Sequence, residues 1–395
     1  MTFVERWMLP DGIEEILPPE AFQIEQLRRE LLDLFGLWGY ELVSPPKAEF
    51  TDSLVVGLGR DVDLLTFKVT DQLTGRTMGI PADFTPQIAR IDAHSLKRSG
   101  VNRLCYTGHV LRTRMENALD TRSPMQLGIE MFGESELLGE AEVISLLLES
   151  LRHAQVEQVC LDLGHVAIFG ALSEAAQLTK QQESDYFNLL QAKALTEIEN
   201  WIEQNLQDPQ QARWFHLLPR LTGNIKSLDG VRDLLEQENV PVVVIESLKE
   251  LQTLAETLEQ RYPEVQLYFD LSELTGYQYL TGMVFSAFIP NQGSAIARGG
   301  RYDHIGKVFG RSRSAVGFTA DLVSIYRQGQ VNHNLAPGIF VPESQNPAQW
   351  QAIQALRAQG ERVICAGSGQ TDPLSYQVCD RQLLEVDGEF KVEIL

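Results

Sequence analysis

Long apolar runs, clustered cysteines and an excess of basic side chains are all missing from this chain of 395 residues. No stretch approaches the roughly 20 consecutive apolar residues that a membrane-spanning helix needs. The first residues carry no basic segment followed by an apolar one, and the four cysteines lack the spacing of metal ligands. We therefore expect a cytoplasmic protein with reduced thiols and with no membrane span, metal site or cofactor.

The charge balance argues against a nucleic-acid partner. The chain has 54 acidic and 33 basic side chains, which gives a formal net charge of −21. Proteins that bind nucleic acids usually present a basic surface, because phosphate contacts dominate their affinity. Since no strongly basic stretch stands out in the sequence, we expect no nucleic-acid binding.

Two blocks of predicted strands enclose a polar, mostly helical segment at about 170–262. A helix to about Gly36 precedes the first block, which contains strands at 41–46, 64–71, 76–84, 102–112 and 123–132 and a helix at 136–154. The second block contains strands at 266–271, 277–288 and 294–300 and a helix at about 316–327. This order predicts an α+β core over residues 1–330, in which helices flank one antiparallel sheet and the helical segment is an insertion.

The last residues, 331–395, are expected to form a separate, small α/β unit. Strand-like residues at 338–341 precede a helix-like run at 349–358 and a further strand at 362–365. The unit has eight acidic and four basic side chains, a balance that does not suit an RNA-binding face.

Polar residues at two places could bind a small ligand. Gln126 and Glu130 lie on the face of their strand opposite to its apolar residues, although a solvated sheet face would look the same. Asp83 and Thr85 follow a predicted strand and could both approach an ammonium group. The alternative is that one of them caps the helix that starts there, and both roles are compatible.

An aromatic stripe at 277–285 includes Tyr277 and Tyr279 on one face of the predicted strand. Such stripes belong to a protein core more often than to a ligand site. The pattern therefore leaves a core role and a ligand-binding role open for Tyr279.

Several segments in this order resemble class II aminoacyl-tRNA synthetases, and histidyl-tRNA synthetase in particular, over about residues 8–327. The similar segments are Gly39–Pro46, Asp83–Thr85, the stretch from Arg112, Gln126–Gly133, Leu274–Phe285, Gly299–Asp303 and Ala315–Phe318. The resemblance implies the class II sheet and self-association through the dimer interface that the first segment forms in that family.

Three positions depart from the synthetase pattern where that family places residues for ATP chemistry. Ser324 and Thr275 stand where the family has arginines, and Arg114 stands where it has an adenine-binding glutamate. Adenylation builds negative charge on phosphate oxygens and needs cations around them. Because the loss of one such donor costs about 2.7–4 kcal/mol, we expect no adenylation.

The departures are similar to those of a synthetase paralogue, the regulatory subunits of ATP phosphoribosyltransferase, which Leu9–Ile13 and Ala82–Gln87 also fit. This resemblance implies a non-catalytic subunit in the first step of histidine biosynthesis, in a hetero-octamer with a short-form catalytic subunit that needs it for activity. It also implies feedback inhibition by L-histidine. An active histidyl-tRNA synthetase and another synthetase-derived amino-acid sensor are the alternatives.

The same resemblance implies that histidine occupies the former substrate pocket. Its ammonium would meet Asp83, Thr85 and Gln126, and its imidazole would meet Glu130. Tyr279 and Tyr302 would form the walls of the pocket. Arg112 is the candidate for binding the carboxylate, in place of the arginine that Thr275 replaces.

Overall fold

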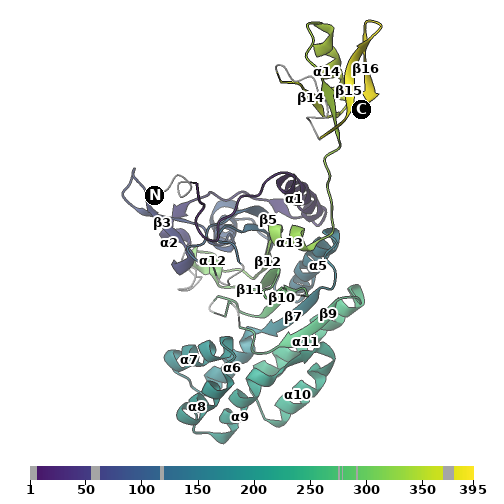
Figure 1. Ribbon diagram of the computed structural model, residues 1–395. Helices are drawn as coiled ribbons and strands as arrows, with labels where there is room; N and C mark the ends of the chain where they lie inside the picture. Colours follow the sequence, from purple (N-terminus) through teal and green to yellow (C-terminus); the bar gives the residue numbers. More distant parts are fainter. Residues whose placement is uncertain are drawn as a thin grey trace. The chain divides into compact units, whose positions relative to one another are not determined.

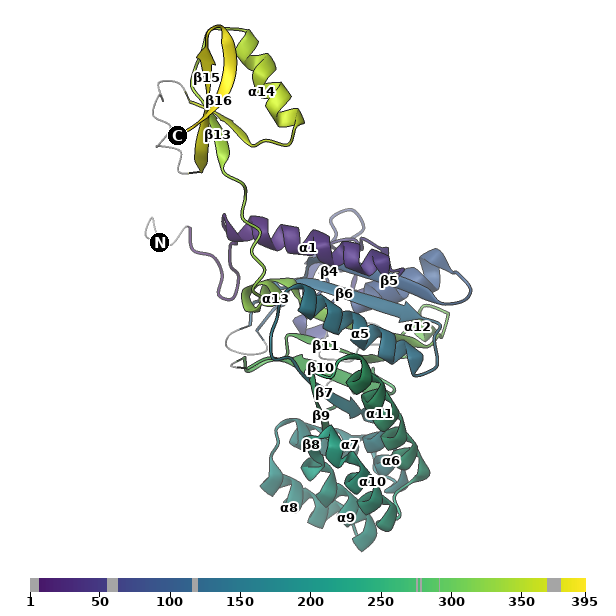
Figure 2. The ribbon, with the colours of Figure 1, turned by 90° about the vertical axis from the view of Figure 1, so that its right-hand side faces the viewer.

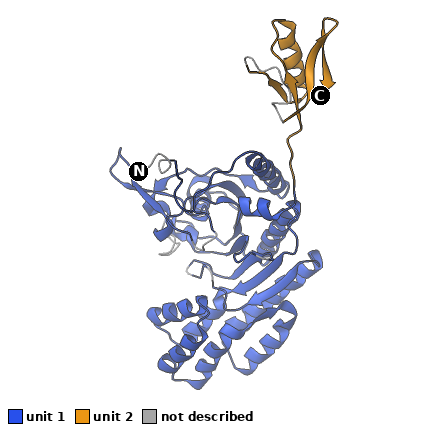
Figure 3. Cartoon of the chain, in the orientation of Figure 1, with its two compact units in different colours: residues 1–331 blue, residues 332–395 orange. Residues whose placement is uncertain are grey.

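The structure is a computed structural model that describes residues 7–54, 63–115, 120–274, 276–277, 279–290, 292–367 and 378–395. The chain divides into two compact units, Met1–Val331 and Asn332–Leu395 (Figure 3). In the described part of the chain, no helix is long and apolar enough to cross a membrane.

The first unit is built around a nine-stranded sheet (Figure 1). Its strands, in spatial order, are β1 (Glu41–Leu42), β5 (Asn102–His109), β6 (Met125–Phe132), β12 (Ala315–Asp321), β11 (Ala297–Arg301), β10 (Met283–Phe288), β7 (Cys160–His165), β9 (Gln266–Asp270) and β8 (Thr222–Asn224). All neighbours pair antiparallel except β1 with β5 and β7 with β9. Because β12 pairs with β6, strands of both sequence blocks share this sheet as predicted, although the predicted strands at 64–71 and 76–84 form a separate small sheet.

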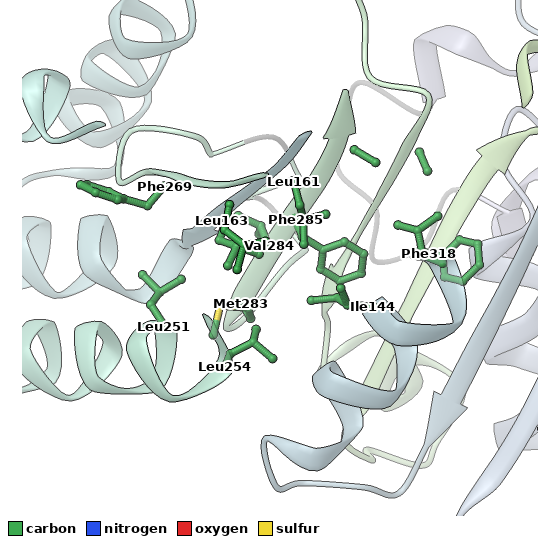
Figure 4. Close-up of a cluster of buried hydrophobic side chains, with 14 of the residues drawn as sticks. Ile144, Leu161, Leu163, Leu251, Leu254, Phe269, Met283, Val284, Phe285 and Phe318 are labelled. Atoms are coloured by element: carbon green, nitrogen blue, oxygen red, sulfur yellow. The ribbon is translucent and has the colours of Figure 1, made fainter. Parts of the chain in front are cut away.

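One face of this sheet carries the main hydrophobic core. The helices that contact the sheet there are α1 (Glu20–Leu37), α5 (Leu138–His153), α11 (Val242–Arg261) and α13 (Leu322–Gln328), and Figure 2 shows α1 and α5 along the strands. Leu163, Met283 and Phe285 of the central strands are fully buried near Leu251 and Leu254 of α11 (Figure 4). Alternation along each strand therefore leaves the opposite face free for polar residues.

The opposite face is partly covered by a small sheet in the order β2 (Glu49–Phe50), β4 (Thr77–Ile80) and β3 (Phe67–Thr70), followed by helix α4 (Thr85–Arg90). Strands β3 and β4 form the hairpin that the sequence predicts, with Gly75 in its turn. Phe84 and Ile88 pack with Leu104 and Tyr106 of β5 in a second apolar cluster. The start of α4 is thereby held against the polar face of the large sheet.

The polar segment in the middle of the chain forms helices α6 (Val166–Ala175), α7 (Lys180–Gln191), α8 (Leu195–Asn205), α9 (Pro209–Leu217), α10 (Leu228–Gln237) and α11. Aromatic rings join them: Tyr186 stacks on Phe169 and packs edge-on against Phe215. This segment also supplies β8, and β7 comes directly before it. Both strands extend the large sheet, and neither is predicted from the sequence.

The predicted strand at 277–288 is wrong in its first half, because β10 begins only at Met283. Gly276 has φ +80°, and its carbonyl accepts the N–H groups of Tyr279 and Leu280 at 2.9 and 2.8 Å. A glycine with positive φ favours a turn over an extended strand. Tyr279 therefore lies in a turn rather than in a strand.

The predicted helix at 316–327 is also wrong in its first half. Residues 315–321 form strand β12, and α13 starts at Leu322. Asp321 ends the strand and caps the helix, since its Oδ1 accepts the N–H of Val323 at 3.2 Å. The apolar residues of this run fit the periodicity of a strand as well as that of a helix, so periodicity alone does not decide between them.

The second unit is a four-stranded sheet with one helix. Its strands lie in the order β14 (Val363–Cys365), β13 (Gly338–Val341), β15 (Cys379–Val386) and β16 (Glu389–Ile394), and its helix is α14 (Ala348–Ala358). Ile339, Val341, Ile353 and Leu383 form its core. The order β13–α14–β14, with both strands parallel, is the α/β arrangement expected for this part of the chain.

A side chain at position 317 would overlap the Glu130 carboxylate, because Gly317 pairs directly with Glu130 across β12 and β6. We expect Gly317→Ala to lower the free energy of unfolding by about 1–3 kcal/mol, as overpacking does. The control is Gly36→Ala in α1, where nothing lies within 4 Å of an added Cβ and a gain of up to about 1 kcal/mol is expected. Denaturant titration measures both, and equal effects would contradict the close approach.

Candidate functional site

A cavity of about 690 Å³ lies on the polar face of the large sheet. Its lining comes from β6, β10, β11 and β12, from the segment Ala82–Thr85, from the turn with Tyr279, and from Phe187 and Gln191 of α7. The volume is in the range of sites for small molecules. The cavity contains Asp83, Thr85, Arg112, Glu130, Tyr279 and Tyr302, which are six of the seven predicted ligand-binding residues.

Glu130 lies in the cavity and is only 1% exposed. Its Oε1 accepts hydrogen bonds from the hydroxyl groups of Thr85 at 3.0 Å and Tyr106 at 3.2 Å. Its Oε2 accepts a hydrogen bond from the hydroxyl of Tyr302. Three different elements therefore converge on one carboxyl group.

The environment of Glu130 favours its protonated form. Burial, assisted by the nearby Asp83 carboxylate, raises the pKa of Glu130 to about 8, although the hydroxyl donors of Tyr302, Thr85 and Tyr106 act in the opposite direction. A carboxyl group with such a pKa can hold or release a proton near neutral pH. It is therefore suited to a ligand that brings a proton or a positive charge.

Asp83 lies both at the start of α4 and in the cavity wall. Its Oδ1 accepts the backbone N–H of Thr85 at 2.7 Å in the first turn of α4, and its side chain also lines the cavity. Together Asp83 and Glu130 place two carboxyl groups in the same cavity. Such a pair attracts a cationic group.

Gln126 is not among the described residues that line the cavity, and it is 3% exposed. Its Oε1 accepts the backbone N–H of Phe84 at 3.1 Å. Gln126 thereby holds the segment that carries Asp83 and Thr85. Its predicted contact with the ligand stays a prediction.

Tyr302 owes its position to the residues on either side of it. Arg301 donates from Nη2 to Glu140 at 2.6 Å and from Nη1 to the Glu134 carbonyl at 3.0 Å. Asp303 accepts the backbone N–H of Ala315 at 3.0 Å. The segment Gly299–Asp303 is thus fixed at the end of β11, and the Tyr302 hydroxyl points at Glu130.

Three arginines line the cavity: Arg112, Arg114 and Arg298. Arg112 donates from Nε to the Ala82 carbonyl at 3.4 Å, and Arg114 is exposed. Ser324 is not in the described lining, because its hydroxyl donates to Asp321 Oδ2 at 2.8 Å in the first turn of α13. Thr275 lies outside the described residues.

Sequence reasoning missed Tyr106 and Arg298. Tyr106 lies opposite Gly128 on β6, and Arg298 lies opposite Thr319 on β12. Strand register, which depends on pairings far apart in the chain, is the signal that places Arg298 in the cavity lining and Tyr106 next to Glu130. In the described part of the chain, no group of three or more His, Cys, Asp and Glu side chains could hold a metal ion.

Known proteins are similar to this chain along its whole length. A histidyl-tRNA synthetase family model matches residues 12–325, and a model of the C-terminal domain of the ATP phosphoribosyltransferase subunit HisZ matches residues 336–393. The ATP phosphoribosyltransferase regulatory subunit of Teredinibacter turnerae is 54% identical over 100% of both chains. The chain belongs to the family of ATP phosphoribosyltransferase regulatory subunits. The member from Cellvibrio japonicus is 53% identical over 99% of this chain and 98% of its own.

Solved structures agree with this family. A Bacillus halodurans protein described as an ATP phosphoribosyltransferase regulatory subunit/histidyl-tRNA synthetase has TM-score 0.81 and 26% identity, with 94% of this chain and 96% of that one covered. Histidyl-tRNA synthetase from Nostoc sp. PCC 7120 has TM-score 0.78 and 17% identity, with 98% and 97% covered, which shows a shared fold. The predicted class II α+β fold is therefore confirmed. As a member of the regulatory-subunit family, the chain is a non-catalytic subunit.

The raised pKa of Glu130 predicts a pH dependence of stability. Between about 4.5, the usual pKa of a glutamate, and about 8, the folded chain holds one more proton than the unfolded chain. The contribution of Glu130 to stability is therefore complete below pH 4.5 and is lost as the pH rises to 8, by roughly 3–5 kcal/mol.

We expect Glu130→Gln to remove this loss and to flatten the free energy of unfolding between pH 6 and pH 9, measured by urea titration. The control is Glu25→Gln. The guanidinium of Arg28 lowers the pKa of Glu25 to about 2, so this substitution leaves the slope above pH 6 unchanged. An unchanged slope in Glu130→Gln would contradict a proton held by the folded chain at this site.

Proposed function

We propose that this chain regulates a short-form catalytic subunit of ATP phosphoribosyltransferase, the first enzyme of histidine biosynthesis, by binding free L-histidine in the cavity. Family membership supports the regulatory role and a catalytic partner. Feedback inhibition by the final product is a reason for such a subunit to keep an amino-acid pocket without adenylation chemistry. The observation that carries the choice of ligand is the buried Glu130 with its three hydroxyl donors.

The imidazole ring of histidine fits the chemistry of Glu130. Imidazole has an unperturbed pKa near 6.5 and two ring nitrogens, of which one or both can donate a hydrogen bond. The pKa of Glu130 is raised by burial to about 8, so one proton can be shared between the two groups at neutral pH. The complex then places no uncompensated charge inside the protein.

The α-ammonium group would lie near Asp83 and Thr85. Asp83 offers a carboxylate at the cavity wall, and Thr85 links that wall to Glu130 through its hydroxyl. Charge-assisted hydrogen bonds of this kind are stronger than neutral ones. The half-buried ring of Tyr279 and the buried ring of Tyr302 would enclose the ligand between them.

Regulation requires that histidine binds two states of the assembly with different affinities. A coupling of this kind is typically about 1–3 kcal/mol, which corresponds to a 5- to 150-fold change in affinity. Histidine would therefore stabilise the assembly state in which the catalytic subunit is inhibited. The catalytic subunit in turn would change the affinity of this chain for histidine by the same factor.

We expect Glu130→Ala and Asp83→Asn to weaken histidine binding at least about tenfold, because each removes a charge-assisted hydrogen bond of about 1.5–3 kcal/mol. Calorimetric titration of the purified chain measures this. Ser324→Ala is the control, since Ser324 does not line the described cavity and its substitution should leave the affinity unchanged. Wild-type affinity in Glu130→Ala would contradict the pocket assignment.

Self-association through the surface around the first synthetase-like segment is also proposed. Leu37 and Leu42 are 85% and 58% exposed, and Trp38 and Val43 beside them are half-buried. Apolar residues gathered in this way are typical of an interface between proteins. The resemblance of Gly39–Pro46 to the dimer-forming segment of class II synthetases supports a second copy of the chain as the occupant.

We expect Leu42→Asp to shift the chain from dimer to monomer in light scattering at micromolar concentration, because it buries a charge in the interface. Leu73→Asp is the matched control. Leu73 is 95% exposed in the β3–β4 turn, so the same substitution there should leave the mass unchanged. A dimer that persists in Leu42→Asp would exclude this surface.

A further inference from the structure

We propose that Arg298 holds the carboxylate of the bound amino acid and thereby makes the site selective for free histidine over ligands that lack this group. This inference rests on the proposed function. It concerns a residue that the sequence did not indicate, on the strand next to β12. Arg298 would also take the place of the synthetase arginine that is Thr275 in this chain, and would provide the cation for the ligand.

Strand register places Arg298 inside a polar row on the cavity face. Arg298 pairs with Ser286 of β10 on one side and with Thr319 of β12 on the other. All three residues line the cavity. Directly opposed residues of neighbouring strands have Cβ atoms about 5 Å apart, so Ser286 and Thr319 are the neighbours of Arg298 in this row.

The distance from Arg298 to Glu130 suits a ligand with an ionic group at each end. Glu130 pairs with Gly317, which precedes Thr319 by two residues. Arg298 is therefore two strands and two residues away from Glu130, which places their Cα atoms about 12 Å apart. Side chains on one face of a sheet stand roughly perpendicular to it, so the guanidinium and the carboxyl group can contact opposite ends of one ligand on this face.

Arg112 is less well placed for the same role. Its Nε already donates to the Ala82 carbonyl at 3.4 Å, and its charge acts on Asp321. Asp321 pairs with Gln126, four residues from Glu130 along β6. Arg112 therefore lies toward the end of the strands at Asp321, whereas Arg298 lies only one row from Glu130 on the cavity face.

The chemistry of the row matches a carboxylate. The planar guanidinium of arginine presents paired N–H donors that fit the two oxygens of a carboxylate. Ser286 and Thr319 are the polar neighbours of Arg298 in the same row. Histidine would then be held at its imidazole by Glu130, at its ammonium by Asp83 and at its carboxylate by Arg298.

The test compares L-histidine with histidinol, in which a hydroxymethyl group replaces the carboxylate. Calorimetric titration of the full chain should show that the wild type prefers histidine roughly ten- to hundredfold, as expected for one charge-assisted contact. Arg298→Gln should weaken histidine binding by that factor and leave histidinol binding unchanged, so that the preference disappears. Arg112→Gln, the matched control, should keep the preference.

The outcomes separate this inference from the proposed function. If Arg298→Gln still prefers histidine, or if only Arg112→Gln loses this preference, the role of Arg298 is overturned. The proposal that the chain binds histidine would still stand. Failure of the wild type to bind histidine would overturn both. Histidinol binding by Arg298→Gln at wild-type affinity shows that the variant is folded, and thermal unfolding of all variants provides the second check.

Discussion

The burial of one carboxyl group, that of Glu130, determines how the cavity of this protein is built. The carboxyl needs a glycine opposite it on β12, since any side chain at Gly317 would overlap it. It also needs hydrogen-bond donors, because a buried polar group without partners is costly. The hydroxyl groups of Thr85, Tyr106 and Tyr302 supply these donors, and each is held by further contacts such as the Arg301–Glu140 ion pair.

The same arrangement explains how a synthetase fold can serve regulation. In the proposed function, the amino acid is recognised on the cavity face of the central strands, which Asp83 and Glu130 line. Activation with ATP depends on cations such as the synthetase arginine that Ser324 replaces. In this chain, Ser324 forms part of a helix cap with Asp321. Arg298, on the cavity face, is the residue that we propose to bind the carboxylate. A site of this kind retains ligand binding without the chemical step.

The sequence predicted the fold well where local patterns and family motifs agree. The hairpin of β3 and β4 and the pairing of both strand blocks in one sheet are confirmed. The aromatic run before Met283 and the apolar run of β12 were assigned wrongly, because a positive φ at Gly276 and a cap at Asp321 decide those boundaries. Such local backbone choices depend on the partners that tertiary structure brings.

The site was predicted from residues that belong to recognisable motifs, and six of these seven line the cavity. Gln126 lies beside the cavity, where its side-chain oxygen accepts the Phe84 N–H, and Arg298 was missed because only strand register reveals it. The most direct test of the account is a crystal structure of the chain grown with saturating L-histidine. We expect the ligand in this cavity, with an imidazole nitrogen within hydrogen-bond distance of Glu130 and the ammonium group at Asp83. Histidine bound elsewhere, or a cavity that stays empty, would contradict the account.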